Sequence, residues 1–313
     1  MNKTLLIVFS LVLVVSANAQ TPKRTMALTF DDLPYVQIGD GSYVTRGRAV
    51  TTKILNVLKK HKAPAVAFVN EGKLGDSVER QARIGLLRQW VDYGAILGNH
   101  TYSHPDFNQL TVEQFEQEIL KGEVVTRQLM RSRRPYQLYF RHPQTHTGDT
   151  IEKKEAIEKF LAAHGYKLTP HTIENSDFVF NVGYAQALQR NDQALAKRLR
   201  DEYLDLTITA TAFAEKVSPE IFGREIPQIL LIHANDINAD SLDEMLSRFE
   251  ARGYTFVTLD QVMADPAYET KVTYISKYGP TWLFRWSKSK GLNLSFAGDP
   301  DPPKWVMDLY NGR

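Results

Sequence analysis

Several residue types that take part in catalysis and metal binding follow short apolar stretches of the sequence. Two aspartates end the stretch "LTFDD", two histidines lie in "GNHTYSH", and an arginine and a histidine follow two further apolar stretches. The residues are Asp31, Asp32, His100, His104, Arg141 and His233. Because parallel α/β folds build their active sites at the carboxyl ends of strands, we expect these side chains to lie near one another.

The two histidines of "HTYSH" are spaced so that they can share a metal ion. His100 and His104 are four residues apart, about one helical turn, so both imidazoles can reach one point if the chain coils there. Two neutral imidazoles and one carboxylate form a set of three ligands that leaves positions open for water and substrate. The chain has no cysteine, so we expect the aspartate pair to supply the carboxylate and zinc or another divalent first-row ion to bind.

Each of these signals also has an ordinary structural explanation. Histidines four apart in a loop are often surface residues or hydrogen-bonded core residues, and two aspartates after a strand often cap the next helix. Their joint occurrence at several expected strand ends favours the chemical interpretation.

The elements that would position these residues alternate regularly along the chain. Short apolar stretches predict strands at 25–30, 65–70, 95–99, 136–140, 228–233 and 255–259, with a weaker one near 172 or 178. Apolar residues at helical spacing predict helices over 48–60, 78–91, 111–131, 151–164, 185–216 and 242–252. This alternation predicts an α/β fold with a parallel sheet covered by helices, either a barrel or a doubly wound sheet of seven or eight units.

The two ends of the chain differ from this regular part. Lys3, an apolar run over 5–15 and the small residues of 17–19 match a secretory signal peptide over residues 1–19, with an uncleaved anchor as the alternative. We therefore expect an exported protein, periplasmic or secreted, that is not inserted in the membrane after cleavage. After about residue 260 the periodicity is lost, and we expect residues 263–313 to be an extension packed on the main domain. The alternating aromatics of 282–286 predict a half-buried strand within it.

The charge of the chain bears on its partners. It carries 38 basic and 36 acidic residues, mixed along its length, for a formal net charge of +2. A protein that binds nucleic acid usually shows a basic patch or stripe, so no nucleic-acid partner is expected.

Five short motifs together resemble those of a known enzyme family. "TFDD", "HTYSH", "FRHP", "ENSDF" and "LLIH", in this order and at these separations, are similar to the five motifs of the polysaccharide deacetylases, carbohydrate esterase family 4. The resemblance covers roughly residues 25 to 260. It implies a distorted (β/α) barrel of about seven units as the catalytic domain, residues 20–262, with 263–313 as a C-terminal extension. It also implies a divalent metal, zinc first with cobalt, nickel or manganese as alternatives, and an acetylated glycan as substrate.

The resemblance assigns a role to each matching position. It implies Asp32, His100 and His104 as metal ligands, Asp31 as catalytic base, His233 as general acid, Arg141 as the holder of the base, Asp177 as the residue that orients the acid, and Leu231 as a wall of the acetyl pocket. Two further substrate contacts are expected from position. The backbone N–H of Gln144 would stabilise an oxyanion, and Phe107, just past the second motif, would stack on a sugar ring.

Departures from the family pattern concern the expected substrate wall. Leu33 and Pro34 follow the aspartate pair where glycine is usual, and Gln144 replaces an aromatic residue. Glu174 and Phe178 stand where aspartate and tryptophan are usual.

From the motifs and the roles that they imply, we predict a metal-dependent hydrolase acting on non-peptide carbon–nitrogen bonds, which removes N-acetyl groups from an amino-sugar polysaccharide or oligosaccharide. An O-acetyl esterase or another C–N hydrolase on the same scaffold is the alternative, and a non-catalytic carbohydrate-binding protein is a third hypothesis.

Overall fold

The computed structural model of the chain describes residues 24–76, 78–133 and 135–312. The expected signal peptide, residues 1–19, lies outside these ranges. Within them, no helix is both long enough and apolar enough to cross a lipid bilayer.

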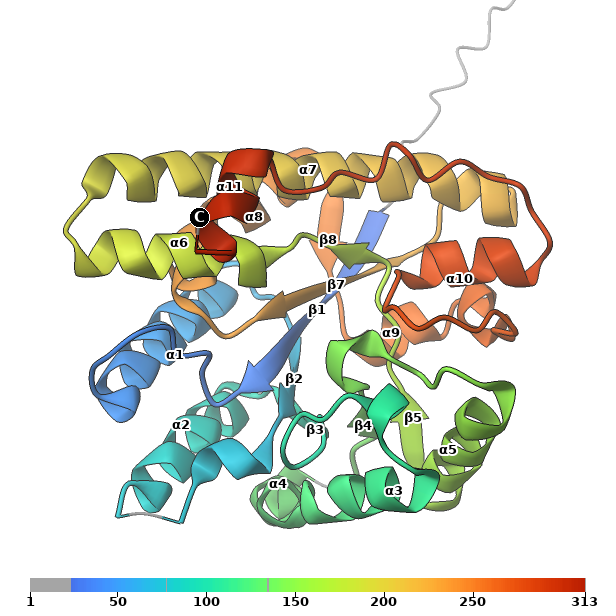
Figure 1. Ribbon diagram of the computed structural model, residues 1–313, viewed down its shortest axis with the longest axis horizontal. Helices are drawn as coiled ribbons and strands as arrows, with labels where there is room; N and C mark the ends of the chain where they lie inside the picture. Colours follow the sequence, from blue (N-terminus) through green and yellow to red (C-terminus); the bar gives the residue numbers. More distant parts are fainter. Residues whose placement is uncertain (1–23, 77, 134, 313) are drawn as a thin grey trace, which may run out of the picture.

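The centre of the molecule is an eight-stranded sheet whose pairings are parallel. Seven strands follow the order β5-β4-β3-β2-β1-β7-β6, and β8 pairs with β1 beside this path. The strands are β1 (Arg24–Leu33), β2 (Ala65–Val69), β3 (Ile96–Asn99), β4 (Leu138–Phe140), β5 (Tyr166–Leu168), β6 (Ile173–Glu174), β7 (Gln228–His233) and β8 (Tyr254–Phe256). The path curls into an incomplete barrel surrounded by helices (Figure 1), which confirms the predicted α/β class and the distorted barrel of about seven units.

Helices cover the outside of this sheet (Figure 1). The α-helices are α1 (Tyr43–Lys60), α2 (Arg80–Tyr93), α3 (Val112–Lys121), α4 (Val124–Leu129), α5 (Ile151–Ala163), α6 (Asp177–Gln189), α7 (Gln193–Phe222), α8 (Asp236–Ala251), α9 (Leu259–Met263), α10 (Trp282–Ser289) and α11 (Lys304–Tyr310). Short 3₁₀ helices are η1 (Glu71–Leu74), η2 (Phe107–Gln109), η3 (Met130–Arg133), η4 (Pro143–Thr145) and η5 (Pro266–Glu269). The central strands β1, β2 and β7 are buried almost throughout, as expected for parallel strands with both faces covered.

The prediction of a single helix over 111–131 is wrong, because α3 ends before Gly122 and α4 begins as a separate helix after it. The predicted capping box at Thr111 and Gln114 is present. A Cβ atom on Gly122 would lie 2.5 Å from the carbonyl carbon of Thr101, in the loop that carries both candidate histidine ligands. Glycine therefore allows this segment to approach the loop, a contact that local periodicity does not report.

The long helix expected over 185–216 is also interrupted, and the strand expected over 282–286 is a helix. Asn191 has a φ of 56° and Asp192 caps the start of α7, so α6 and α7 are separate helices that pack on each other. Trp282 and Trp286, four residues apart in α10, are both buried. Residues four apart lie on the same side of a strand and of a helix, so the pattern over these five residues fits both. The packing of this segment against α7 favours the helix.

The segment after α9 lies against the main body of the molecule. Figure 1 shows α11 beside α6 and α10 below one end of α7, and both pairs are in contact. Trp286 and Val306 from this segment belong to the main hydrophobic core.

Candidate active site

An irregularity at the end of β1 directs two neighbouring carboxylates into one cavity. In a regular strand, adjacent side chains point to opposite faces. Between Phe30 and Leu33, however, β1 advances three residues while its partner β2 advances two, and Asp32 has a φ of 67°. This bulge lets both Asp31 and Asp32 line the same cavity. The helix-cap explanation fails, because the next helix, α1, is capped by Ser42.

Three side chains form a potential metal site at this position. Ligand atoms of Asp32, His100 and His104 all lie within 4.8 Å of one another. Asp32 Oδ1 lies 3.6 Å from His100 Nε2 and 3.4 Å from His104 Nε2. The histidines lie in a loop rather than on a helical turn, with left-handed backbone at Thr101 and His104. The loop, not a helix, brings the two imidazole rings to a centroid distance of 5.0 Å.

The protonation and hydrogen bonding of these residues fit a cation. His100 Nδ1 donates to the carbonyl oxygen of Arg141 at 2.8 Å, which leaves the lone pair of Nε2 facing the cavity. Burial lowers the pKa of His100 to about 4 and also lowers the pKa of His104, so both are neutral at pH 7, as metal ligation requires. Asp32 Oδ1 is buried without a hydrogen-bond partner among the described residues. Such an orphaned oxygen next to two imidazole lone pairs is suited to a divalent ion.

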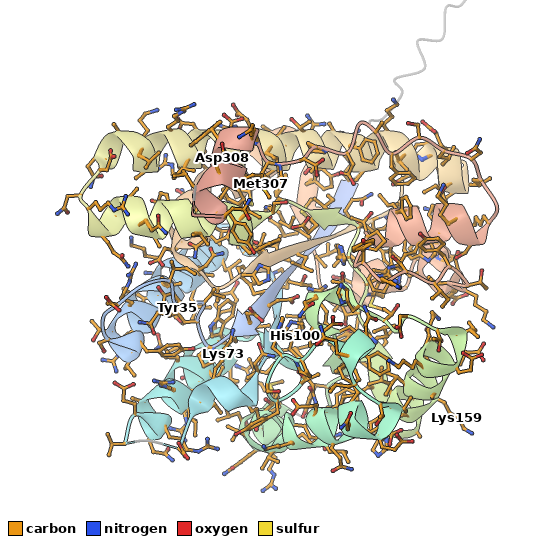
Figure 2. All side chains as sticks on the ribbon, in the orientation of Figure 1. Tyr35, Lys73, His100, Lys159, Met307 and Asp308 are labelled. Carbon is orange, nitrogen blue, oxygen red and sulfur yellow. The ribbon has the colours of Figure 1, made fainter. Side chains whose placement is uncertain are left out.

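A lysine that the sequence did not suggest also faces this site. Lys73 Nζ lies 3.3 Å from Asp32 Oδ2 and donates to the Asp32 carbonyl oxygen at 3.0 Å. Figure 2 labels Lys73 and His100, which both lie near the carboxyl end of β1. Burial would raise the pKa of Asp32, but Lys73 and the nearby histidines outweigh this effect and lower it below the ordinary value. Asp32 is therefore ionised, with Oδ2 paired to lysine and Oδ1 available.

Asp31 is held by a buried arginine. Arg141 follows β4 and donates from Nη1 to Asp31 Oδ1 at 2.8 Å, while its Nη2 donates to the Pro170 carbonyl at 3.0 Å. The guanidinium lies over the ring of Phe68 at 4.6 Å, which fixes its plane. Asp31 Oδ2 lies 3.8 Å from His100 Nε2. One oxygen of this carboxylate is thus anchored, and the other lies beside the candidate metal site.

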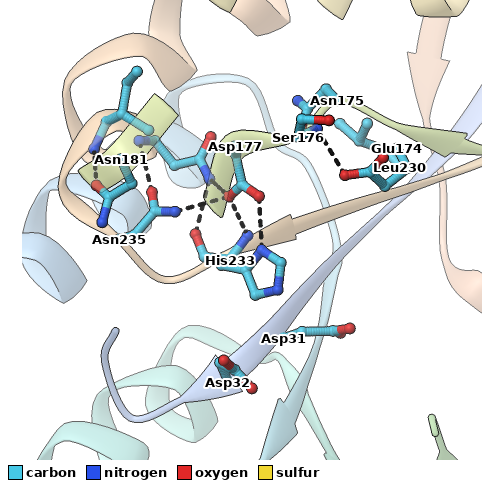
Figure 3. Close-up of polar contacts among 12 residues, drawn as sticks. Asp31, Asp32, Glu174, Asn175, Ser176, Asp177, Asn181, Leu230, His233 and Asn235 are labelled. Carbon is cyan, nitrogen blue, oxygen red and sulfur yellow. Dashed lines mark hydrogen bonds and ion pairs between the residues drawn. The ribbon is translucent and has the colours of Figure 1, made fainter. Parts of the chain in front are cut away.

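His233 is held by a buried carboxylate on the other side of β1. Asp31 and His233 are partners across the β1–β7 pairing, and His233 Nδ1 lies 2.7 Å from Asp177 Oδ1. Asp177 Oδ2 accepts from the His233 main-chain N–H and from the amides of Asn235 and Asn238 (Figure 3). Burial would lower the pKa of His233, but the charge and hydrogen bond of Asp177 outweigh it and raise the pKa to about 9. The imidazole is therefore cationic at neutral pH, with Nε2 free of this network.

One cavity of about 370 Å³ brings most of the predicted residues together. Its lining includes Asp31, Asp32, His100, His104, Gln144, Leu231 and His233. Arg141 and Asp177 are almost fully buried behind it, in contact with the residues they were expected to hold. The prediction for Phe107 is wrong. Its ring is fully buried and stacks on Phe115 at 4.3 Å, so it cannot meet a sugar.

The expected effect of Leu33 and Pro34 on the substrate wall also needs correction. Both residues are buried, and neither belongs to the cavity lining. Their replacement of a glycine therefore concerns how the chain leaves β1, not the surface that a substrate would meet.

Five further residues line the cavity besides those to which the motifs assigned a role. These are Thr145, His171, Glu174, Phe178 and Gly279. Burial raises the pKa of Glu174 to about 7, and Phe178 is 43% exposed, with its ring 6.2 Å from that of His233. Glu174 and Phe178 are the two fourth-motif departures that were expected to lie in the substrate wall, and both line the cavity. Gly279 belongs to no motif, because it comes from the C-terminal segment.

Comparisons with known proteins agree with the motifs. Residues 18–167 match the family model described as polysaccharide deacetylase. The peptidoglycan-N-acetylglucosamine deacetylase of Bacillus cereus is 32% identical over 107 residues, which are 34% of this chain and 32% of that protein. The peptidoglycan-N-acetylmuramic acid deacetylase PdaA of Bacillus subtilis is 25% identical over 245 residues, 78% of this chain and 73% of that protein. The chain thus aligns with about a third of the first relative and nearly three quarters of the second.

Solved structures include a similar chain from Bacillus anthracis described as a CE4 family pseudoenzyme. It is 16% identical, the match covers 78% of this chain and 66% of that one, and the TM-score is 0.49. Residues 18–167, nearly half of the chain, therefore match the polysaccharide deacetylase family.

Proposed function

We propose that the chain is a metal-dependent hydrolase that removes N-acetyl groups from an amino-sugar polysaccharide or oligosaccharide. The observation that carries this proposal is the composition of one cavity. Three potential metal-ligand atoms lie within 4.8 Å of one another there, flanked by a carboxylate and an imidazole that are each fixed by a buried partner. Relatives named as peptidoglycan and chitin deacetylases support an acetylated glycan as the substrate class.

Asp32, His100 and His104 would hold the ion, and their N/N/O set makes zinc the first choice. When bound there, a divalent ion would polarise the acetyl carbonyl and lower the pKa of a water molecule. Asp31 would then take the proton from the attacking water, and Arg141 holds that carboxylate in place.

The leaving nitrogen needs a proton before the carbon–nitrogen bond can break. His233 is cationic, and its Nε2 can donate that proton, so that acetate and a free amine are released. Leu231 lines the cavity and would contact the acetyl methyl group. We assign the main-chain N–H of Gln144, from the same cavity wall, to the oxyanion that forms as water adds.

We infer that the protein acts outside the cytoplasm, in the periplasm or the medium. The apolar run and small residues of 1–19 support export, and two relatives are named for their action on peptidoglycan.

The pH dependence of turnover should change when Asp177 is replaced, because Asp177 raises the pKa of His233. Protonated His233 is the active form of the acid, so activity is present below its pKa of about 9 and is lost as the pH rises through that value. In Asp177→Asn, the charge that raises this pKa is removed. The basic limb of the kcat profile should therefore move to lower pH by about one unit or more. Profiles of kcat against pH for both proteins check this, and an unmoved limb would exclude His233 as the acid held by Asp177.

A substrate panel tests the proposed reaction. Acetate release should be measured on N-acetylated chitooligosaccharides, peptidoglycan fragments and O-acetylated xylan at equal acetyl concentration. We expect the highest kcat/KM on an N-acetylated substrate. A kcat/KM that is orders of magnitude higher on the ester would show that the protein is an O-acetyl esterase and not an amidase. If no substrate releases acetate, the remaining hypothesis is a non-catalytic carbohydrate-binding protein.

A further inference from the structure

A loop at the rim of the active site is held by residues of the C-terminal segment. The loop comprises residues 142–147 and includes Gln144, the proposed oxyanion donor, and Thr145, which both line the cavity. Gln144 and Thr145 each have a φ of 53°, in the left-handed region. Backbone in this region is strained for a non-glycine residue and persists only where surrounding contacts enforce it.

Arg285 of α10 supplies the first of these contacts. Its side chain is fully buried, and Nη2 donates to the Thr145 carbonyl at 2.8 Å while Nη1 donates to Thr147 Oγ1 at 2.9 Å. Nε donates to the Pro280 carbonyl at 3.0 Å, so the same guanidinium ties the loop to the C-terminal segment. Within the described chain, these partners are neutral oxygens rather than carboxylates. Burying a charge among neutral partners costs free energy. The forked guanidinium reaches these separate oxygens at once, which the single ammonium group of a lysine could not do.

Gly279 supplies the second contact by closing directly on the loop. Its carbonyl oxygen accepts from Thr145 Oγ1 at 2.8 Å. A Cβ atom on Gly279 would lie 1.9 Å from Thr145 Oγ1 and 2.1 Å from the Gln144 carbonyl oxygen. No side chain fits at this position unless the main chain of Gln144 moves.

The same segment is tied to two other parts of the cavity region. The main-chain N–H of Trp282 donates to the carbonyl of His171, a cavity residue, and the two rings are 5.4 Å apart. The Lys277 carbonyl accepts from the amide of Asn108, shortly after the loop of the histidine ligands. The segment 277–285 therefore spans the cavity rim and is fixed to the barrel at both ends.

We infer that the segment 277–285 is a positioning element of the active site, in which Gly279 and Arg285 hold the main chain of Gln144 and Thr145 against the cavity. The inference rests on the proposed function for its catalytic consequence, since the oxyanion role of Gln144 belongs to that proposal. It gives the C-terminal segment a part in turnover although none of the metal ligands or proton-transfer residues lies in it.

Gly279→Ala tests this inference, with Gly298→Ala as the matched control. Both glycines lie in the C-terminal segment outside the left-handed region, but a Cβ on Gly298 would only meet Phe213 at an ordinary 3.5 Å. We expect Gly279→Ala to speed hydrogen exchange in peptides covering 141–148 and to lower kcat about tenfold or more, with KM changed less than about threefold. Zinc binding and exchange in peptides covering 98–105 should match wild type, and Gly298→Ala should change none of these.

A second pair of variants keeps the test open if Gly279→Ala does not fold. Thr147→Val removes the acceptor of Arg285 Nη1 and keeps the shape, whereas Thr147→Ser keeps the hydroxyl. Thr147→Val should show the same changes as Gly279→Ala at smaller size, and Thr147→Ser should restore wild-type values.

Two results would overturn the inference. One is wild-type exchange over 141–148 and wild-type kcat in both Gly279→Ala and Thr147→Val. The other is loss of zinc binding together with kcat, which would indicate a general folding role. If wild type releases no acetate from any substrate, the proposed function fails, while the exchange comparison still decides whether the segment holds the loop.

Discussion

Replacing Asp31 by asparagine should lower kcat for acetate release by about 10³-fold while zinc binding remains stoichiometric. A general base typically contributes about 10² to 10⁴ to the rate, and the neutral amide cannot accept the proton of the attacking water. The amide oxygen can still accept from Arg141 Nη1, so the variant keeps the anchored geometry. Asp31 is not among the three candidate ligands, and the ion should therefore stay bound.

The measurement is acetate release and zinc content on the same preparation. Asp40→Asn is a matched control, because it makes the same chemical change at an exposed position in the loop after β1. A melting temperature for each protein checks that Arg141, deprived of its buried counter-charge, has not unfolded the variant. Turnover within tenfold of wild type at full zinc occupancy would exclude Asp31 as the base.

Replacing Asp32 by asparagine should have the opposite signature, with loss of metal first and loss of turnover as its consequence. Asp32 Oδ1 is the buried oxygen without a partner that lies within 3.6 Å of both histidine Nε2 atoms. A neutral amide oxygen is a much weaker ligand than a carboxylate, and we expect zinc affinity to fall by about 100-fold or more. Lys73 would also lose its ion pair and leave a positive charge beside the site, which further opposes a cation.

Competition with a chromophoric chelator measures this affinity directly. Raising the zinc concentration should recover part of the turnover of Asp32→Asn, because its base and acid are intact. It should recover none in Asp31→Asn. Zinc affinity equal to that of wild type in Asp32→Asn would contradict the assigned ligand set.

The sequence was informative where the chemistry depends on strand ends. The carboxyl ends of β1, β3, β4 and β7 carry Asp31, His100, Arg141 and His233, and parallel pairing necessarily brings such ends to one edge. Helical and apolar periodicity located most elements, because the helices bury one face in the core and the central strands are buried on both faces.

The sequence was uninformative where the site depends on contacts between distant segments. Nothing local indicates the bulge that turns Asp31 and Asp32 to one side, or that Lys73 would reach Asp32. Phe107 was misassigned because its distance along the chain from His104 does not reveal that it points into the packing of Phe115. Gly279 lies 134 residues from Thr145, so their contact could not be predicted from either motif.

The composition of the cavity bears on the third hypothesis, a non-catalytic carbohydrate-binding protein. In this chain, the three candidate metal ligands, the anchored carboxylate and the anchored imidazole all line one cavity. A complete set favours turnover over mere binding.

Zinc titration of the metal-free protein during acetate release tests the central claim most directly. The protein is stripped with a chelator, dialysed, and assayed on the best N-acetylated substrate as zinc is added. We predict no release at zero zinc, a linear rise, and a break at one zinc ion per chain. Full activity in the stripped protein, or no acetate at any zinc ratio, would contradict the account.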